Sequence, residues 1–252
     1  LRTPAFVRHT NTIYQAHNLQ TEYERRMLEL RYRAPLLGRV DAWDLLRLLH
    51  FTIDHTDRFL MYTSQLIHCL QVFAGVQREV RVREGPRGRR GGGRGRGGRG
   101  VAGFTKAYRS DMLVSALVHD LGKTLTLFGE SDTNVDCMNR IVAYHGNGLD
   151  ALEAHWNHDE FAFARLRGDA RLSRRVKDVL RFHSLRESNQ IGKPVPAGYH
   201  ATSRGDKDSR LTRADWVALA NHTGAADRAR AAFVAHFAHF DAGTKRITPR
   251  IP

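Results

Sequence analysis

The segment that most constrains the fold is an almost continuously apolar run, Met112–Val118, which ends in the pair His119-Asp120. A run of this kind is typical of a helix that is buried on all sides. The polar pair that follows it should therefore point into the interior of the protein. Burying an imidazole and a carboxylate is costly unless they are paired or bound to a metal. The run predicts a helical core built around a polar site.

Apolar residues recur at helical spacing along most of the chain. Val7–Leu30 carries such a stripe, and Asp41 is a candidate cap for a helix whose apolar face includes Trp43. Strand-like alternation is scarce, which predicts an all-α fold. The further expected helices are Thr63–Val76, Met112–Val118, Ala151–Leu166, Leu172–Phe182 and Leu211–Phe240.

The basic charge is concentrated in one unusual segment. The chain of 252 residues has a net charge of +14, and residues 78–100 contribute half of it, with nine arginines and two glutamates. Gly85–Gly100 consists only of glycine, arginine and one proline, so no side chain in it can contribute to a core. We expect one domain over residues 1–252, interrupted by a disordered insertion at about 78–103. A second polar stretch, Glu187–Ser209, is expected to form a long surface loop.

Composition excludes several classes of protein. No uninterrupted apolar run reaches the length of a membrane span. Only Cys69 and Cys137 are present, which indicates reduced thiols and a cytoplasmic location rather than a disulfide framework. The Gly/Arg tract lacks interleaved aromatic residues, so a nucleic-acid partner is not expected. We expect a monomer that binds a small polar substrate.

A series of histidines and aspartates on the apolar sides of the expected helices is the main functional signal. Nitrogen and oxygen donors without thiolate suit iron, manganese or zinc. Each residue has an ordinary interpretation when taken alone, such as a core histidine, a helix cap or, for Asp159 and Glu160, a solvated face. Together they predict one metal site. The series comprises His68, His119, Asp120, His158, His183 and Asp241.

Four motifs in this order resemble the myo-inositol oxygenase family of HD-domain diiron oxygenases. They are HDLGKTLTLFGE, NHDEF, RFHS and FDAGTK, and an N-terminal segment, VRHTNTIYQAHNLQTEYERRM, is also similar. The resemblance implies an HD-domain helical bundle that holds two iron ions per chain. It also implies an enzyme that uses O2 to cleave a carbon–carbon bond of myo-inositol, giving D-glucuronate.

The resemblance assigns ligands and substrate contacts residue by residue. It gives one iron His68, His119, Asp120 and Asp241, and the other His158 and His183, with Asp120 bridging. It implies substrate contacts at Asp54, Lys123, Asp136, Ser184 and Lys245, with Lys123 also a catalytic residue.

Three alternatives remain open at this point. A related diiron oxygenase would act on another polar substrate, such as a hydroxylated organophosphonate. An HD-type phosphohydrolase would use the same ligands to activate water. An RNA-binding protein would depend on the Gly/Arg tract and bind with a steep dependence on salt.

Overall fold

The computed structural model describes residues 3–38, 40–84, 105–136, 139–145, 148–185 and 224–245. This part of the chain is mostly helical, which confirms the expected all-α character. None of its helices is both long and apolar enough to cross a membrane. The α-helices are α1 Pro4–Asn18, α2 Glu22–Arg31, α3 Ala42–Leu48, α4 Gln65–Glu84, α6 Lys106–Val118, α7 Asp132–Val135, α8 His158–Leu166, α9 Arg174–Phe182 and α11 Ala225–Thr244. The shorter elements are the 3-10 helices η1 Leu49–Phe51, η2 Leu121–Phe128 and η3 Leu149–Ala151, and the strands β1 Ile141–Tyr144 and β2 Leu152–Ala154.

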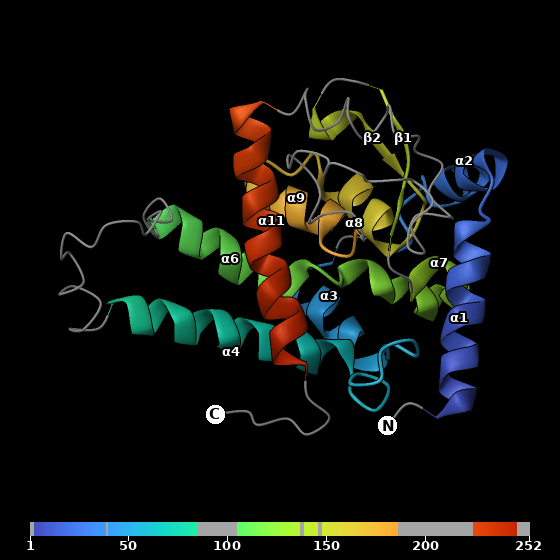
Figure 1. The fold of residues 1–252 in the computed structure, drawn as a ribbon, viewed down its shortest axis with the longest axis horizontal. Coiled ribbons are helices and arrows are strands. Elements are labelled where there is room, and N and C mark those ends of the chain that lie inside the picture. Colours follow the sequence, from blue (N-terminus) through green and yellow to red (C-terminus); the bar gives the residue numbers. More distant parts are fainter. Residues whose placement is uncertain are drawn as a thin grey trace, which may run out of the picture.

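The largest apolar core lies where α4, α6, α9 and α11 meet. Helices α4 and α6 run side by side and α11 crosses them (Figure 1). Met112 of α6 and Phe237 of α11 are fully buried in this core. Gly75 allows α4 and α11 to approach closely, because a Cβ there would lie 2.6 Å from Thr244 Cγ2. This packing brings the end of α6 and the last turns of α11 to the same region of the interior.

The N-terminal stripe does not form one buried helical face. Two helices, α1 and α2, replace the expected continuous helix, and a capping box between Thr21 and Glu24 starts the second. The side chain of each residue bonds the backbone of the other, which satisfies N–H groups that a helix start leaves free. Leu19 and Tyr23 are more than 70% exposed, so the stripe was wrong as a predictor of the buried face.

The expected helix Ala151–Leu166 is wrong in its first part. Residues 152–154 form β2, which pairs antiparallel with β1 in a two-stranded sheet, and helix α8 begins only at His158. Asn157 caps α8 by accepting hydrogen bonds from the backbone N–H groups of Asp159 and Glu160. Strand β2 does alternate, with Glu153 between buried Leu152 and Ala154, but three residues are too few to mark a strand in the sequence.

Two further expectations need correction. Helix α4 continues to Glu84, so the insertion cannot begin at residue 78; Val80, half-buried against the core, holds this last part of the helix. Trp43 was expected on an apolar face but is 68% exposed, while Leu46 and Leu49 are buried. The Gly/Arg tract 85–100, Cys137, the stretch 187–209 and residues 211–223 lie outside the described ranges.

Candidate metal centre

Asp120 stands between two clusters of buried histidines. One cluster contains His68 of α4 and His119 at the end of α6, and the other contains His158 of α8 and His183 at the end of α9. All five residues are buried. The donor atoms within each cluster, counting Asp120 in both, lie within 4.8 Å of one another. These clusters of nitrogen and oxygen donors could each bind a metal ion.

The two carboxylate oxygens of Asp120 face different clusters. Oδ2 lies 3.4 Å from His119 Nε2 and 3.7 Å from His68 Nε2. Oδ1 lies 3.3 Å from His183 Nε2 and 3.6 Å from His158 Nε2. Neighbouring ligands of one ion at about 2.1 Å are roughly 3.0–3.4 Å apart, so these spacings are close to those of a metal shell.

Two of the histidines are held so that Nε2 faces the cluster. His119 Nδ1 lies 3.2 Å from the carbonyl oxygen of Ala116, and His183 Nδ1 lies 3.1 Å from that of Val179. A carbonyl only accepts, so each Nδ1 carries the proton and donates it. In a neutral imidazole this leaves the Nε2 lone pair directed at the centre, the arrangement that metal-binding histidines adopt.

Several buried polar atoms around the clusters lack hydrogen-bond partners, which also suits a metal site. These atoms are His158 Nδ1 and Nε2, His68 Nδ1, Asp159 Oδ1 and Asp241 Oδ1. Asp241 Oδ1 lies 2.9 Å from His68 Nε2 but at an angle that makes no hydrogen bond. Unsatisfied buried polar groups are costly, and a cation among them would offset that cost.

The electrostatics of the centre favour added positive charge. Burial lowers the pKa of His119 to about 3, so this imidazole is neutral at pH 7. Burial would also lower the pKa of His158, but the nearby carboxylate of Asp159 raises it to about 10. Burial opposes ionisation of Asp120, yet the ammonium group of Lys123 holds its pKa well below the usual value. The buried carboxylates therefore attract cations, and a metal ion would meet the same demand.

Gly122 fixes the distance between Asp120 and α8. A Cβ at this position would lie 1.9 Å from the carbonyl oxygen of His158, which no real structure tolerates. Only glycine therefore lets the turn after His119-Asp120 pack directly against the start of α8. This contact sets Asp120 beside His158.

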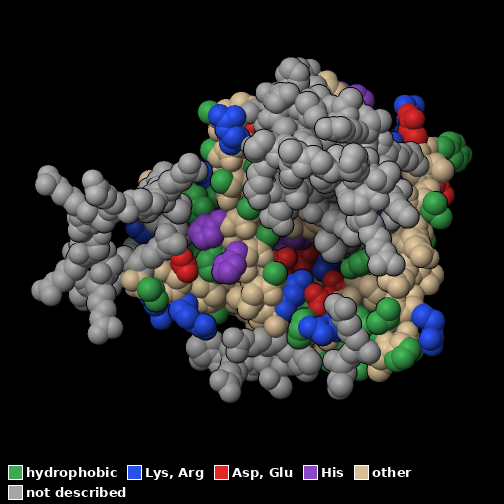
Figure 2. Space-filling view, in the orientation of Figure 1, with side chains coloured by type: hydrophobic (Ala, Val, Ile, Leu, Met, Phe, Trp, Pro, Cys, Tyr) green, Lys and Arg blue, Asp and Glu red, His purple; other side chains and the backbone are tan. Residues whose placement is uncertain are grey.

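A cavity of about 570 Å³ opens beside the two clusters. Figure 2 looks onto a hollow near the middle of the molecule, where acidic, basic and histidine side chains gather. Asp120, His158 and His183 line the cavity from inside, whereas His68 and His119 lie behind it. Helix α1 contributes apolar and polar residues, including Tyr14, to the cavity wall. The volume suits a small metabolite.

Both expected lysines line this cavity, and each is paired with an aspartate. Lys123 Nζ donates to Asp54 Oδ2 over 2.8 Å and also lies 3.3 Å from Asp120 Oδ2. Lys245 Nζ donates to Asp57 Oδ2 over 2.9 Å. Burial would lower the pKa of Lys123, but the carboxylates around it raise the value well above normal. Both lysines therefore stay charged at neutral pH.

The remaining expected substrate contacts divide into two kinds. Ser184 lines the cavity, and its hydroxyl donates to Asp159. Asp136 is not among the described residues that line it. It is buried, and its Oδ2 accepts a hydrogen bond from the backbone N–H of His55. Burial and the neighbouring Asp54 raise the pKa of Asp136 to about 7. Direct substrate contact at Asp136 therefore stays a prediction.

Sequence reasoning missed three polar residues around the centre. Asp159 was treated as part of a solvated face, but it is fully buried, 2.9 Å from His158 Nε2 and 3.4 Å from His183 Nδ1. Asp57 holds Lys245. Gln65 is also fully buried, and its amide, oriented to satisfy both neighbours, donates to Asp120 Oδ2 over 2.7 Å. Neither Asp159 nor Gln65 has a local sequence signal for its burial, which depends on packing between distant segments.

No protein-family model matches this chain, and a search of curated proteins also found no match. The geometry of the clusters and the order of the motifs are therefore the grounds for a functional proposal.

Proposed function

We propose that this protein is a non-haem diiron oxygenase that oxidises a neutral polyol, with the cleavage of myo-inositol to D-glucuronate as the expected reaction. The observation that carries the proposal is the carboxylate of Asp120, whose two oxygens face separate histidine clusters. A carboxylate in this position is suited to bridge two metal ions. The order of the four motifs supports iron and the oxygenase reaction.

In this proposal His68, His119, Asp120 and Asp241 would hold one iron, and His158, His183 and Asp120 the other. The iron pair would supply Lewis acidity toward a substrate hydroxyl and the redox capacity for a reaction with O2. The second cluster has one carboxylate and two imidazoles among its assigned ligands. The carbonyl oxygen of Val179 would orient His183 through Nδ1, and Asp159 beside the cluster would position Ser184 by accepting its hydroxyl hydrogen bond.

The lysines would bind and orient the substrate. Lys123 Nζ is close to Asp120 Oδ2, so a substrate oxygen placed beside this carboxylate would be within reach of the ammonium. Its charge would stabilise an oxygen that loses its proton. Lys245 lies across the same cavity, 3.8 Å from Asp241 Oδ1, and would donate to a second hydroxyl. Asp54 and Asp57 would hold the two ammonium groups in place and accept hydrogen bonds from further hydroxyls.

The charge of the cavity favours a neutral polyol over an organophosphonate. Three described lysines and arginines line it, Lys123, Lys245 and Arg58, against four aspartates. Each lysine is already neutralised by a partner at 2.9 Å or less. A doubly charged phosphonate would have to displace these aspartates, whereas a polyol would accept from the lysines and donate to the aspartates at once.

The test is iron content together with oxygen uptake. Anaerobically loaded protein should hold about two irons per chain and should consume O2 with myo-inositol. Asp120→Asn keeps the shape of the side chain but removes the bridging charge, so iron content should fall to one per chain or less. Asp44→Asn, which alters an exposed aspartate of α3, is the matched control and should keep both irons.

Three results would contradict the proposal. Retention of both irons by Asp120→Asn would show that this carboxylate does not bridge. Release of phosphate from an ester without oxygen uptake would instead identify a phosphohydrolase. Oxygen uptake with a hydroxylated phosphonate, but with no polyol, would reverse the choice of substrate.

A further inference from the structure

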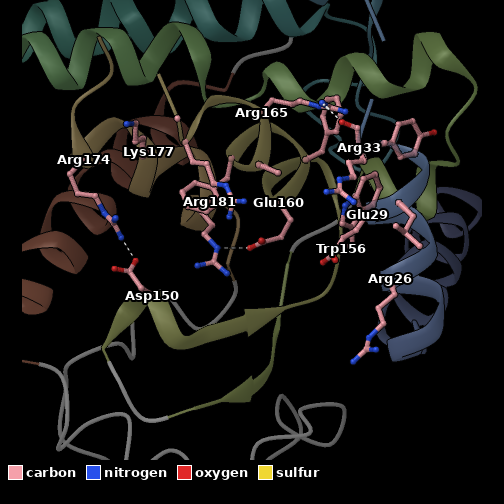
Figure 3. Close-up of a pocket in the computed structure, with 17 residues that line it drawn as sticks. Arg26, Glu29, Arg33, Asp150, Trp156, Glu160, Arg165, Arg174, Lys177 and Arg181 are labelled. Atoms are coloured by element: carbon pink, nitrogen blue, oxygen red, sulfur yellow. Dashed lines mark hydrogen bonds and ion pairs between the residues drawn. The ribbon is translucent and has the colours of Figure 1, made fainter. Parts of the chain in front are cut away.

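A second concave site lies on the opposite side of α8 and α9 from the histidine clusters. This basin has a volume of about 1210 Å³ and is bounded by the end of α2, by α8 and by α9 (Figure 3). Seven lysines and arginines line it, against three acidic residues. It shares none of its lining residues with the cavity beside Asp120. The proposed oxygenase reaction therefore gives it no role.

Several cations of the basin have no acidic partner. Arg33 and Arg167 are exposed, Lys177 is half-buried, and none of them forms an ion pair with a described carboxylate. Arg165 donates only to the backbone carbonyl oxygens of Arg33 and Ala34, over 2.9 and 2.6 Å. By contrast, Arg174 and Arg181 are each paired with an acid of the basin. The excess positive charge is thus available to a ligand.

Aromatic rings hold two of the arginines in place. The guanidinium of Arg165 lies 5.4 Å from the ring centre of Phe161, and that of Arg181 lies 5.0 Å from Phe163. Arg165 is partly buried, and this desolvation lowers its pKa. A cation that has lost water and has no carboxylate beside it is stabilised by an anion. Its orientation is set before any ligand arrives, which lowers the entropy cost of binding.

The shape of the basin indicates the size of the ligand. Arg33 and Arg165 lie toward one end of the site in Figure 3, and Arg174 and Lys177 toward the other. A single small anion would contact only one of these groups. A nucleic-acid duplex is too wide to enter a basin of this volume, whereas a compact molecule with several anionic groups would reach both ends. Planar guanidinium groups match phosphate oxygens in pairs.

We propose that the basin between α2, α8 and α9 binds a compact metabolite that carries more than one phosphate group. The phosphates contact Arg33 and Arg165 at one end and Lys177 at the other, with Arg167 adding charge from the end of α8. The site is separate from the histidine clusters and does not depend on the metal.

Calorimetric titration of the full chain with inorganic tripolyphosphate at physiological salt tests this proposal. We expect saturable binding to one site. The double variant Arg33→Ala/Arg167→Ala removes two exposed cations that hold no ion pair, so the fold should be unaffected. Its binding should be about 10- to 100-fold weaker, since each hydrogen bond between charged groups contributes about tenfold. The matched control, Arg8→Ala/Arg47→Ala, removes the same charge from exposed positions outside the basin and should bind like the unaltered protein.

Tripolyphosphate also binds metal ions, so His119→Ala separates the two sites. Binding should persist in this variant even though the proposed iron content falls. Loss of binding in His119→Ala would place the ligand at the metal centre and overturn the proposal. If both double variants bound tripolyphosphate equally weakly, the effect would come from general surface charge, and this result would also overturn the proposal. Binding of a short single-stranded RNA without binding of tripolyphosphate would identify a different class of ligand.

Discussion

Gly122→Ala should disrupt the proposed metal centre without replacing any proposed ligand. The new Cβ would lie 1.9 Å from His158 O, whereas ordinary contacts begin at 3.4 Å, so η2 and α8 must separate by up to the difference, 1.5 Å. Metal sites tolerate ligand displacements of about 0.2 Å. The movement would carry Asp120 away from His158 and His183. We therefore expect the iron content to fall from about two per chain to about one.

The same variant should lose some stability, because forced separation of packed elements costs about 1–3 kcal/mol. Metal analysis after anaerobic loading, together with thermal unfolding, measures both effects. Gly168→Ala is the matched control, since nothing lies within 4 Å of its new Cβ, and it should keep both irons. Full iron content with unchanged affinity in Gly122→Ala would refute the idea that this glycine sets the position of Asp120.

Two further predictions concern activity and acid stability. Lys123→Ala and Lys245→Ala should each keep iron but lose turnover by about two to three powers of ten, as measured by oxygen uptake at saturating and limiting polyol. Normal turnover in either variant would remove that lysine from the site. Burial, aided by His158, lowers the pKa of His17 to about 4 from 6.5. The unfolded chain therefore gains this proton first, and the free energy of unfolding should fall by about 3 kcal/mol between pH 6.5 and 4. In denaturant titrations of metal-free protein, the free energy of unfolding should fall less over this pH range in His17→Gln than in the unaltered protein. An equal fall in the two proteins would show that His17 is not the cause.

The parts of the fold that local patterns specify were predictable from the sequence. The apolar run before His119 does form a helix and does deliver Asp120 to the interior, although Leu113, Val114, Leu117 and Val118 are only partly buried. The break between α1 and α2 has a local basis, the capping box that begins at Thr21. The stripe failed because Tyr23 and its neighbours face solvent, which periodicity alone cannot distinguish from a core.

The remaining features depend on contacts between distant segments. The strands β1 and β2 are only four and three residues long, so the alternation in β2 is too short to mark a strand without its pairing to β1. Gln65 reaches Asp120 only after α4 has packed against α6. Gly122 belongs to one of the motifs found in the sequence. Glycine is required there because the backbone of His158, 36 positions further along the printed sequence, packs directly against it. Residue type can suggest such positions, and only the packed structure explains them.

The order in which the centre's residues occur in the chain has a consequence for its assembly during synthesis. The donors that face Asp120 Oδ1 are complete once His183 has emerged and α9 has packed. The opposite cluster receives the carboxylate of Asp241 only from α11, whose docking also closes the core around Phe237. The donors that face Asp120 Oδ1 therefore all precede α11 in the chain, whereas the opposite cluster includes a residue of α11 itself. A chain shortened before α11 would carry every proposed ligand of one half and would lack Asp241 of the other.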